Sequence, residues 1–440
     1  MKTSIIVVIA VVVIIVLAAG IYAVTLTSTT KTTTPTTSSV VTSSASSAPP
    51  TSSSTIVATS ASGNCAPYNI GMMEDLTSSV ATFANESIQM AQIAVNQIDA
   101  AGGVNCHQLK LFTANEIPSA SAAANTLVLQ DNVSAMLGIT YAGDAEAIFP
   151  FLSAHHIITI MTTASNNALL QNLTSDYTDY KYFFRITPSD TGYATDAINY
   201  LSSTLKPSSI YFVAEDLDFS HELFQNLSNF ATADGISVAG SVFVPLSQTD
   251  FATTVSSVVA AKPAVVIDCQ TGSGAGTFIQ ELKANPQAAG IKVLYMCNGA
   301  LADPGFQAYL EGSNPSLLNG VIYQIEAGTA TVPLNNVTTY LATQYHNVMG
   351  IYYPYYSFVS NDYVAVQILA AALKQAGTTS DPNAIVSALQ TAQYTGPTGT
   401  IQFNSQHIWV PAFWYTQIQN GKEVVIYPSS VANGSFNATA

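Results

Sequence analysis

The chain has 440 residues and is acidic, with 11 Lys and Arg against 26 Asp and Glu and a formal net charge of −15. So few basic residues exclude the basic patch that nucleic-acid binding requires. Charged residues make up only 8% of the chain, against about 25% in a typical soluble protein. A charge-poor, acidic exterior suits an acidic medium in which carboxylates are largely protonated, a hypothesis that loss of the fold near pH 3 would remove.

An uncharged apolar run extends from Ile5 to Val24 and is preceded by Lys2. About 20 apolar residues span the hydrocarbon core of a bilayer. The run therefore predicts an N-terminal transmembrane helix over residues 1–24 that anchors the chain in the cell membrane, with the bulk of the chain outside. The alternative is a cleaved signal peptide, whose apolar region is usually only about 7–15 residues.

Residues 25–63 form a tract rich in Ser and Thr that has almost no charge. Such a segment buries too little apolar surface to offset the entropy lost on ordering, so we expect an extended stalk. The remainder, residues 64–440, is too long for one core and fits two domains.

The Asn-x-Ser/Thr pattern marks surface sites for N-linked glycans in an external protein. It occurs at Asn85, Asn132, Asn172, Asn226, Asn336, Asn433 and Asn437.

The cysteines are Cys65, Cys106, Cys269 and Cys297. None forms Cys-x-x-Cys, so zinc and thioredoxin chemistry have no support. Cysteines of external proteins usually form disulfides. We expect two local pairs, Cys65 with Cys106 around the first strand–helix unit and Cys269 with Cys297 at the ends of two predicted strands. Four buried thiols are the alternative.

In the first half of the domain region, apolar strands alternate with helical stretches, as in a parallel sheet covered on both faces. Strands are predicted at Asn69–Met73, Leu109–Phe112, Ser134–Ile139 and Ile157–Met161. The third strand breaks into the polar turn Thr140–Asp144 and the fourth into Thr162–Ser165. Parallel sheets bind ligands beyond the carboxyl ends of their strands, so these two turns predict a binding site.

The second half repeats this pattern. Strands are predicted at Ser209–Ala214, Val242–Val244, Ala264–Asp268, Val293–Met296 and Val321–Ile325, followed by a helical region at Val337–Ala376 and a final extended segment at Gly399–Phe403. The predicted fold class is α/β, with two Rossmann-like lobes whose parallel central sheets are joined by a hinge of several crossings and close around a ligand. We expect lobe 1 to comprise residues 64–187 and 327–394, lobe 2 to comprise 188–326 and 395–430, and 431–440 to form a tail.

Four segments carry a family resemblance: Leu76–Ala84, Asn96–Gly103, Gly138–Ser165 and Tyr182–Asp190. In order and spacing they resemble the type I periplasmic binding proteins, which include the leucine/isoleucine/valine and amide receptors of ABC transporters. The resemblance covers Tyr68 to about Tyr427. It implies an extracellular receptor that captures a small polar solute between two lobes and delivers it to ABC permease subunits, without a cofactor and without catalysis.

In that family, the turns after the third and fourth strands hold the carboxylate of the ligand with a hydroxyl, backbone N–H groups and a helix N-terminus. Thr163, Ala164 and Ser165 keep this chemistry, although they also fit a plain turn. In the first turn, Ala142 takes the place of the usual Ser and Asp144 follows two residues on. An ionised Asp144 repels a carboxylate, and its alternative role is the N-cap of the next helix.

In the second lobe, Phe219 stands where the family usually has Tyr. Asn298 takes the place of the acidic residue that pairs with an α-ammonium, and it brings no charge to offset the burial of that group. Asn298 with Gly299 is also a common turn pair. The groups that would bind the carboxylate and the α-ammonium of an amino acid are both weakened. This favours an amide, a peptide fragment, a polyol or another mostly neutral solute.

The candidate ligand-binding residues lie on the turns of both lobes, with aromatic side chains as apolar walls. They are Phe83, Tyr141, Ala142, Gly143, Asp144, Thr163, Ala164, Ser165, Phe219, Thr271 and Asn298. No metal site is expected, because the adjacent His155 and His156 point apart and lack a third ligand. A ligand-sensing receptor on the same fold and an envelope or adhesion protein are the alternatives to a transport receptor.

Overall fold

The two lobes and their sheets lie in the unit Ala61–Ala440. The computed structural model describes residues 65–78, 80–165, 168–173, 175–296, 318–326, 343–344, 357–396, 399–410 and 412–438. Within these ranges, no helix is long and apolar enough to cross a membrane. The predicted anchor (1–24) and stalk (25–63) lie outside the described residues.

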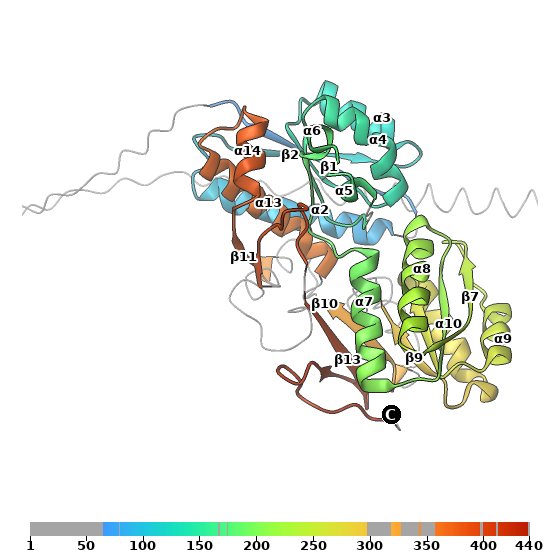
Figure 1. The fold of residues 1–440 in the computed structure, drawn as a ribbon. Helices are drawn as coiled ribbons and strands as arrows, with labels where there is room; N and C mark the ends of the chain where they lie inside the picture. The colour runs from blue at the N-terminus through green and yellow to red at the C-terminus, as the bar shows by residue number, and fades with distance from the viewer. Residues whose placement is uncertain are drawn as a thin grey trace, which may run out of the picture. The chain divides into compact units, whose positions relative to one another are not determined.

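The first sheet has five strands in the order β2-β1-β3-β4-β5, and all of its pairs are parallel (Figure 1). Its strands are β1 (Tyr68–Glu74), β2 (Leu109–Asn115), β3 (Ala135–Gly138), β4 (Ile158–Met161) and β5 (Phe183–Arg185). The four predicted strands are confirmed with small shifts of their ends. Every residue of β3 and β4 is buried, as expected for apolar strands covered on both faces.

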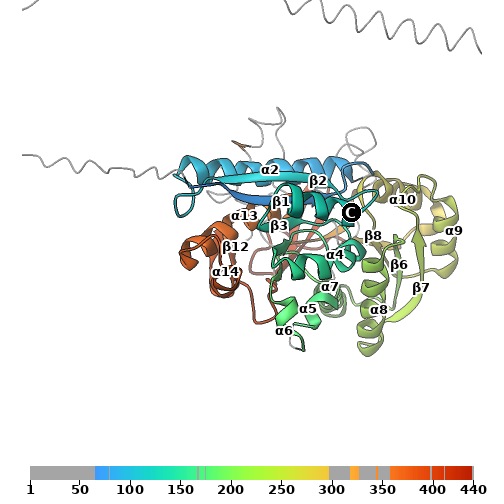
Figure 2. The ribbon, with the colours of Figure 1, turned by 90° about the horizontal axis from the view of Figure 1, so that it is seen from above.

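Helices surround this sheet, and α2 packs beside α13 in both views (Figures 1 and 2). They are α2 (Ala81–Ala100), α3 (Ala120–Asn125), α4 (Ala142–Ala154), α5 (Ala168–Gln171), α6 (Tyr177–Tyr180), α13 (Ser357–Ala376) and α14 (Pro382–Leu389), with the π-helical turn η1 (Thr126–Gln130). α13 confirms the end of the predicted helical region, whose earlier part lies mostly outside the described residues.

The second sheet has seven strands in the order β14-β13-β10-β9-β8-β6-β7. They are β6 (Ser209–Glu215), β7 (Ser237–Val244), β8 (Val265–Cys269), β9 (Lys292–Tyr295), β10 (Ile322–Glu326), β13 (Phe413–Gln419) and β14 (Lys422–Tyr427). The strands from β6 to β10 pair in parallel, whereas β13 and β14 add an antiparallel edge.

The helices of this lobe alternate with its strands. They are α7 (Asp190–Tyr200), α8 (Asp218–Ala233), α9 (Ala252–Ala261) and α10 (Gly272–Ala284), with the short turns η2 (Leu201–Leu205) and η3 (Pro286–Ala288).

The C-terminal part of the chain differs from the sequence prediction. The segment expected to complete the pattern, Gly399–Phe403, contributes β12 (Gly399–Ile401), which pairs with β11 (Tyr394–Gly396) in a small hairpin. The antiparallel strands β13 and β14 were not predicted. Asn420 and Gly421 between them both have positive φ, and Asn-Gly between two β-rich segments is a strong hairpin signal.

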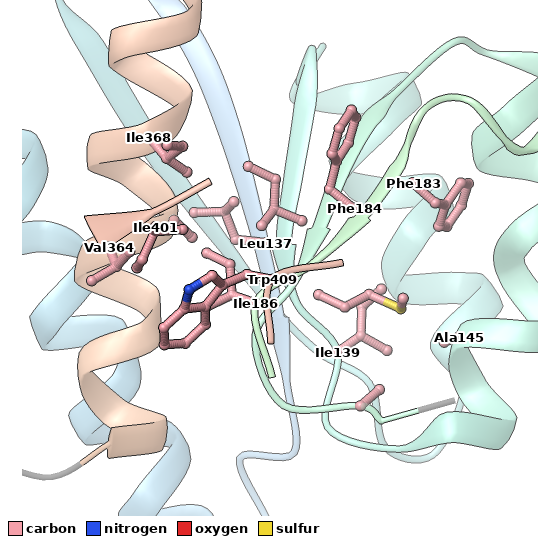
Figure 3. Packing of buried hydrophobic residues seen from close by; sticks show 14 of the residues in the cluster. Leu137, Ile139, Ala145, Phe183, Phe184, Ile186, Val364, Ile368, Ile401 and Trp409 are labelled. Atoms are coloured by element: carbon pink, nitrogen blue, oxygen red, sulfur yellow. The ribbon is translucent and has the colours of Figure 1, made fainter. Parts of the chain in front are cut away.

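The segment around Trp409, between β12 and β13, completes the core of the first lobe. Figure 3 shows Leu137 of β3, Phe184 of β5, Val364 of α13 and Trp409 among the buried side chains of one cluster. Each such side chain contributes about 1.5–3 kcal/mol when it is fully buried. Residues near 409 therefore stabilise the lobe that starts at β1, whereas the sequence pattern placed 395–430 in the other lobe.

The backbone at the end of β5 holds the same segment. The N–H of Arg185 donates to the carbonyl of His407 (2.9 Å), and the N–H of Trp409 donates to the carbonyl of Arg185 (3.0 Å). These two bonds form a short parallel bridge between the end of β5 and the segment that leads to β13. The chain thus crosses between the two sheets both after β5 and before β13.

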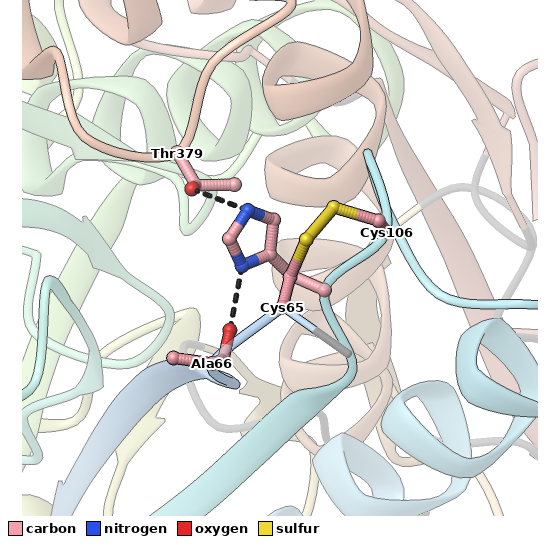
Figure 4. The surroundings of a disulfide bond; sticks show 5 residues. Cys65, Ala66, Cys106 and Thr379 are labelled. Atoms are coloured by element: carbon pink, nitrogen blue, oxygen red, sulfur yellow. Dashed lines mark hydrogen bonds between the residues drawn. A yellow bond between two sulfur atoms is a disulfide. The ribbon is translucent and has the colours of Figure 1, made fainter. Parts of the chain in front are cut away.

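A disulfide joins Cys65 to Cys106, one of the two expected pairs (Figure 4). It links the start of β1 to the turn before β2. The neighbouring imidazole of His107 donates from Nδ1 to the carbonyl of Ala66 (2.6 Å) and accepts at Nε2 from the hydroxyl of Thr379 (3.1 Å). Cys269 is also disulfide-bonded, and Cys297 lies outside the described residues.

Most of the described sequons are exposed. Asn85, Asn132, Asn172 and Asn433 lie at the surface, Asn226 and Asn437 are half-buried, and Asn336 lies outside the described residues. The side-chain amide of Asn226 donates to the Asp190 carboxylate (2.6 Å). Because Asn226 is half-buried and a glycan would attach to the nitrogen that donates to this carboxylate, Asn226 is a poor acceptor.

Candidate functional site

Acidic side chains gather where β1, β2 and β3 end. Glu74 closes β1, Asp75 follows it, and Glu116 follows β2; each is at most 1% exposed. Thr140, just after β3, connects them. Its hydroxyl donates to Glu74 (2.8 Å) and its N–H donates to Glu116 (3.2 Å), while the N–H of Asp75 donates to the hydroxyl of Thr140 (3.0 Å). The carboxyl edge of the first sheet is therefore lined by acids.

Gly138 permits this close packing at the end of β3. Its φ of +86° favours glycine, and an added Cβ would lie 2.5 Å from the carbonyl oxygen of Met73 and 2.7 Å from Oε1 of Glu74. Real Cβ atoms do not approach other atoms this closely. The turn that follows β3 thus depends on a glycine at this position.

Replacement of Gly138 by Ala is expected to lower the free energy of unfolding by at least about 2 kcal/mol, because the methyl group adds a clash to the cost of the positive φ. Urea denaturation measures the loss. Gly235→Ala is the matched control, since Gly235 has a similar φ (+75°) and nothing within 4 Å of its added Cβ. Equal losses in the two variants would contradict a role for the contact with Glu74.

Burial raises the pKa of these carboxyl groups. Burial is the main cause of the raised pKa of Glu74, and the neighbouring Asp362 and Glu116 add to it. Burial and the charge of Asp144 raise the pKa of Glu116 to about 8. Burial raises the pKa of Asp362 to about 7, although hydrogen bonds from Thr162 and Ser87 act in the opposite direction. Glu116 is therefore largely protonated below neutral pH.

Asp75 behaves differently from its neighbours. Burial acts to raise its pKa, but hydrogen bonds outweigh burial and hold the pKa below the usual value. The N–H groups of Thr77 (2.9 Å) and Ser78 (3.0 Å) donate to one carboxylate oxygen, and the hydroxyl of Tyr141 donates to the other (2.8 Å). Asp75 is therefore a fixed negative charge at the edge of the sheet.

The predicted first turn lies directly beside these acids. Tyr141 occupies the N-cap position of α4 and Ala142 begins the helix, so the N-cap alternative for Asp144 is wrong and its carboxylate lies in the first turn. A Cβ on Gly143 would lie 3.1 Å from Oδ2 of Asp218, at the start of α8 in the other lobe. The N-terminus of α4 is thus already surrounded by carboxylates of the protein.

The predicted second turn, Thr162–Ser165, has fewer free hydrogen-bonding groups than its sequence suggested. The N–H of Ala164 donates to the carbonyl of Ile139 (2.9 Å), and the hydroxyl of Ser165 donates to the carbonyl of Thr163 (3.4 Å). The buried hydroxyl of Thr163 has no hydrogen-bond partner among the described residues. Of the three residues, Thr163 is the one whose side chain remains available to a ligand.

In the second lobe, Thr271 is held by Glu215, the last residue of β6. Both the N–H (2.7 Å) and the hydroxyl (2.5 Å) of Thr271 donate to one carboxylate oxygen of Glu215. Phe219 packs edge-on to Tyr193, with ring centroids 6.1 Å apart. Asn298 lies outside the described residues, and Phe83 is half-buried against the main core.

The acidic residues of this edge other than Asp144 were not predicted from the sequence. A signal was present for Glu74, Asp75 and Glu116, because each follows an apolar strand directly, where side chains of a parallel sheet meet a ligand. No local signal exists for Asp362. It lies on α13 and accepts a hydrogen bond from the Thr162 hydroxyl (2.6 Å), so its position depends on how that helix packs.

Residues 67–423 match a family model described as periplasmic binding protein. The chain belongs to the periplasmic binding protein family. This confirms the resemblance seen in the sequence, and the family is one of solute-binding receptors, in agreement with the expectation that the chain is not an enzyme.

Individual relatives are distant. The Leu/Ile/Val-binding protein homolog 3 of Brucella melitensis is 24% identical over 335 residues, which are 75% of this chain and 84% of that protein. The substrate-binding protein LivJ of Streptococcus pneumoniae, solved in complex with isoleucine, has a TM-score of 0.68 and 18% identity, covering 82% of this chain and 100% of LivJ. A solute-binding protein from R. palustris in complex with benzoate has a TM-score of 0.70 and 16% identity, covering 82% and 95%. At these identities the two structures support the α/β fold with two parallel-sheet lobes.

Proposed function

We propose that this periplasmic binding protein is an extracellular receptor that captures a small polar solute between its lobes and delivers it to the permease of an ABC transporter. The observation that carries the proposal is the family match over residues 67–423, which includes the strands from β1 to β13. The turns at the carboxyl edges then supply the binding groups, Tyr141 to Asp144 and Thr163 in one lobe and Phe219 and Thr271 in the other. Closure of the lobes, rather than chemistry, retains the solute.

The N-terminal apolar run Ile5–Val24 and the Ser/Thr-rich tract 25–63 that follows it also have a role in the proposed function. The run anchors the receptor in the cell membrane, and the stalk keeps the binding unit near the permease while leaving its lobes free to close. A tethered receptor has a high effective concentration at its permease. The exposed sequons and the disulfide between Cys65 and Cys106 suit a protein that works outside the cell.

The direct test is thermal unfolding of residues 64–440 with a panel of solutes that covers carboxylates, amino acids, neutral amides, sugars and amines. A ligand that binds only the folded state raises the free energy of unfolding, by about 2.7 kcal/mol at one hundred times Kd. The unfolding midpoint therefore rises as the ligand concentration increases. We expect at least one small solute to do so. Failure of every class at millimolar concentration would contradict solute capture and favour an envelope or sensory role.

A further inference from the structure

The proposed binding edge is unusually acidic on both lobes. On lobe 1, Asp75, Glu116 and Asp144 lie at the ends of β1 and β2 and in the first turn of α4. On lobe 2, Glu215 ends β6 and Asp218 begins α8. Among the described residues, the charges named as acting on Glu116 and Asp144 are the carboxylates of Asp75 and Asp144.

One cation ends a strand of the same sheet, and it already has acidic neighbours. Arg185 ends β5, is fully buried, and has Asp190, Tyr193 and Glu222 as its interacting groups. Arg185 therefore has acidic groups of its own, and the carboxylates of Asp75 and Asp144 lie just beyond β1 and β3.

The N-terminus of α4 is the usual place for an anion in a fold of this kind, because its free N–H groups carry partial positive charge. Here that place is taken by the protein's own carboxylates. Asp144 lies in the first turn, and Asp218 reaches it from the second lobe to within 3.1 Å of the position of a Cβ on Gly143. A carboxylate ligand would have to enter beside these two negative charges, which repel it.

A buried carboxyl oxygen at the same edge also lacks a hydrogen-bond partner among the described residues. Glu116 is 0% exposed, and one of its oxygens, Oε1, has no hydrogen-bond partner among the described residues. Its other oxygen accepts from the N–H of Thr140, which places the carboxyl at the turn beside Tyr141. A buried carboxyl oxygen without a partner is costly. Although burial raises the pKa of Glu116 to about 8, a ligand cation beside it favours the carboxylate, which then accepts hydrogen bonds from N–H groups of the ligand.

We propose, on the basis of the solute-binding function above, that the ligand is an organic cation without a carboxylate, whose amine or guanidinium group lies at the carboxyl edge between Asp75, Asp144 and Asp218. The aromatic side chain of Tyr141, whose hydroxyl donates to Asp75, adds a face that favours an organic cation. A metal ion is a poorer fit, because within the described ranges the acidic oxygens of this edge do not form a cluster close enough to coordinate one.

The test compares agmatine and cadaverine with isoleucine, benzoate and isobutyramide at pH 7 and equal ionic strength, using calorimetry on residues 64–440. Calcium chloride serves as the inorganic cation. We expect agmatine or cadaverine to bind, and Asp144→Asn to weaken that binding at least tenfold. Asp179→Asn, which removes an exposed carboxylate on α6, is the matched control and should leave the affinity unchanged.

A double variant tests whether the carboxylates of Asp144 and Asp218 exclude an anion from the N-terminus of α4. In Asp144→Asn/Asp218→Asn, the N-terminus of α4 and the Thr163 hydroxyl become open to an anion, so benzoate should bind this variant and not the wild-type protein. Binding of benzoate or isobutyramide to the wild-type protein without binding of the amines would overturn the cationic ligand and leave the receptor function intact. Binding of isoleucine without the amines would also overturn it, because the site would then accept a ligand that carries a carboxylate. Binding of calcium alone would also overturn it. If no solute of any class binds, the receptor function fails and the inference fails with it.

Discussion

The protein is expected to be more stable at pH 5 than at pH 8. Burial raises the pKa of Glu116 to about 8 and that of Glu326 to about 8, and it raises the pKa of Asp362 to about 7. Burial also raises the pKa of Glu74 and of Asp268 well above their usual values. A carboxyl group whose pKa is higher in the folded than in the unfolded state binds more protons when folded, so its contribution to stability is complete below about pH 4 and is lost as the pH rises through 7 to 8.

Two groups oppose this trend. Burial lowers the pKa of His407 to about 4, so its contribution is complete above about pH 6.5 and is lost as the pH falls toward 4. The lowered pKa of Asp75 gives a contribution that is present above about pH 4 and is lost only in stronger acid. Because several buried carboxyls oppose one histidine, we expect a net gain on the order of several kcal/mol between pH 8 and pH 5.

Urea denaturation at pH 3, 5 and 8 measures this dependence. Glu116→Gln keeps an acceptor for the N–H of Thr140 but does not titrate, so it should raise stability at pH 8, change it little at pH 5 and flatten the profile. Asp179→Asn, at an exposed position, is the control and should leave the profile unchanged. A wild-type protein that is more stable at pH 8 than at pH 5 would contradict the prediction. A fold that persists at pH 3 would support an acidic medium.

The strands and the edge at which the site lies follow from local patterns in the sequence. Predominantly apolar runs such as Ile158–Met161 form buried parallel strands, because a strand covered on both faces buries the side chains on both of its sides. The breaks after them necessarily meet at one edge of the sheet. Apolar runs and their polar breaks are therefore sufficient to place Tyr141, Asp144 and Thr163 at the candidate site.

What the sequence could not supply depends on packing between distant segments. Asp362 joins the acidic group because α13 places it against Thr162, which is 200 residues away in the chain. Asp218 approaches the N-terminus of α4 from the other lobe. Thr271 is predicted to contact the ligand, but Glu215 at the end of β6 takes both of its donors. Local periodicity carries no information about such pairings, so the charge of the site depends on contacts that only the folded chain makes.

Replacement of Arg185 by Met is expected to lower the free energy of unfolding by about 3–5 kcal/mol, the usual cost of removing one partner from a buried charge group. Arg185 is fully buried, and Asp190 is 2% exposed. Burial raises the pKa of Asp190, and Arg185 is among the groups that act to lower it. Without the guanidinium, Asp190 must either stay charged in a buried position or take up a proton, and both outcomes destabilise the fold at neutral pH.

A double-mutant cycle separates this charge effect from the loss of packing. Asp190→Asn removes the carboxylate while keeping an acceptor for the amide of Asn226, so Arg185→Met/Asp190→Asn should recover part of the stability that Arg185→Met loses. Lys422→Met, at an exposed position of β14, is the control and should change stability by less than about 0.5 kcal/mol. Because the backbone of Arg185 also pairs with residues 407 and 409, its side chain and main chain together hold both crossings between the sheets. A loss below about 1 kcal/mol in Arg185→Met would show that the backbone bridge alone suffices, since that is the size of an ordinary surface contact.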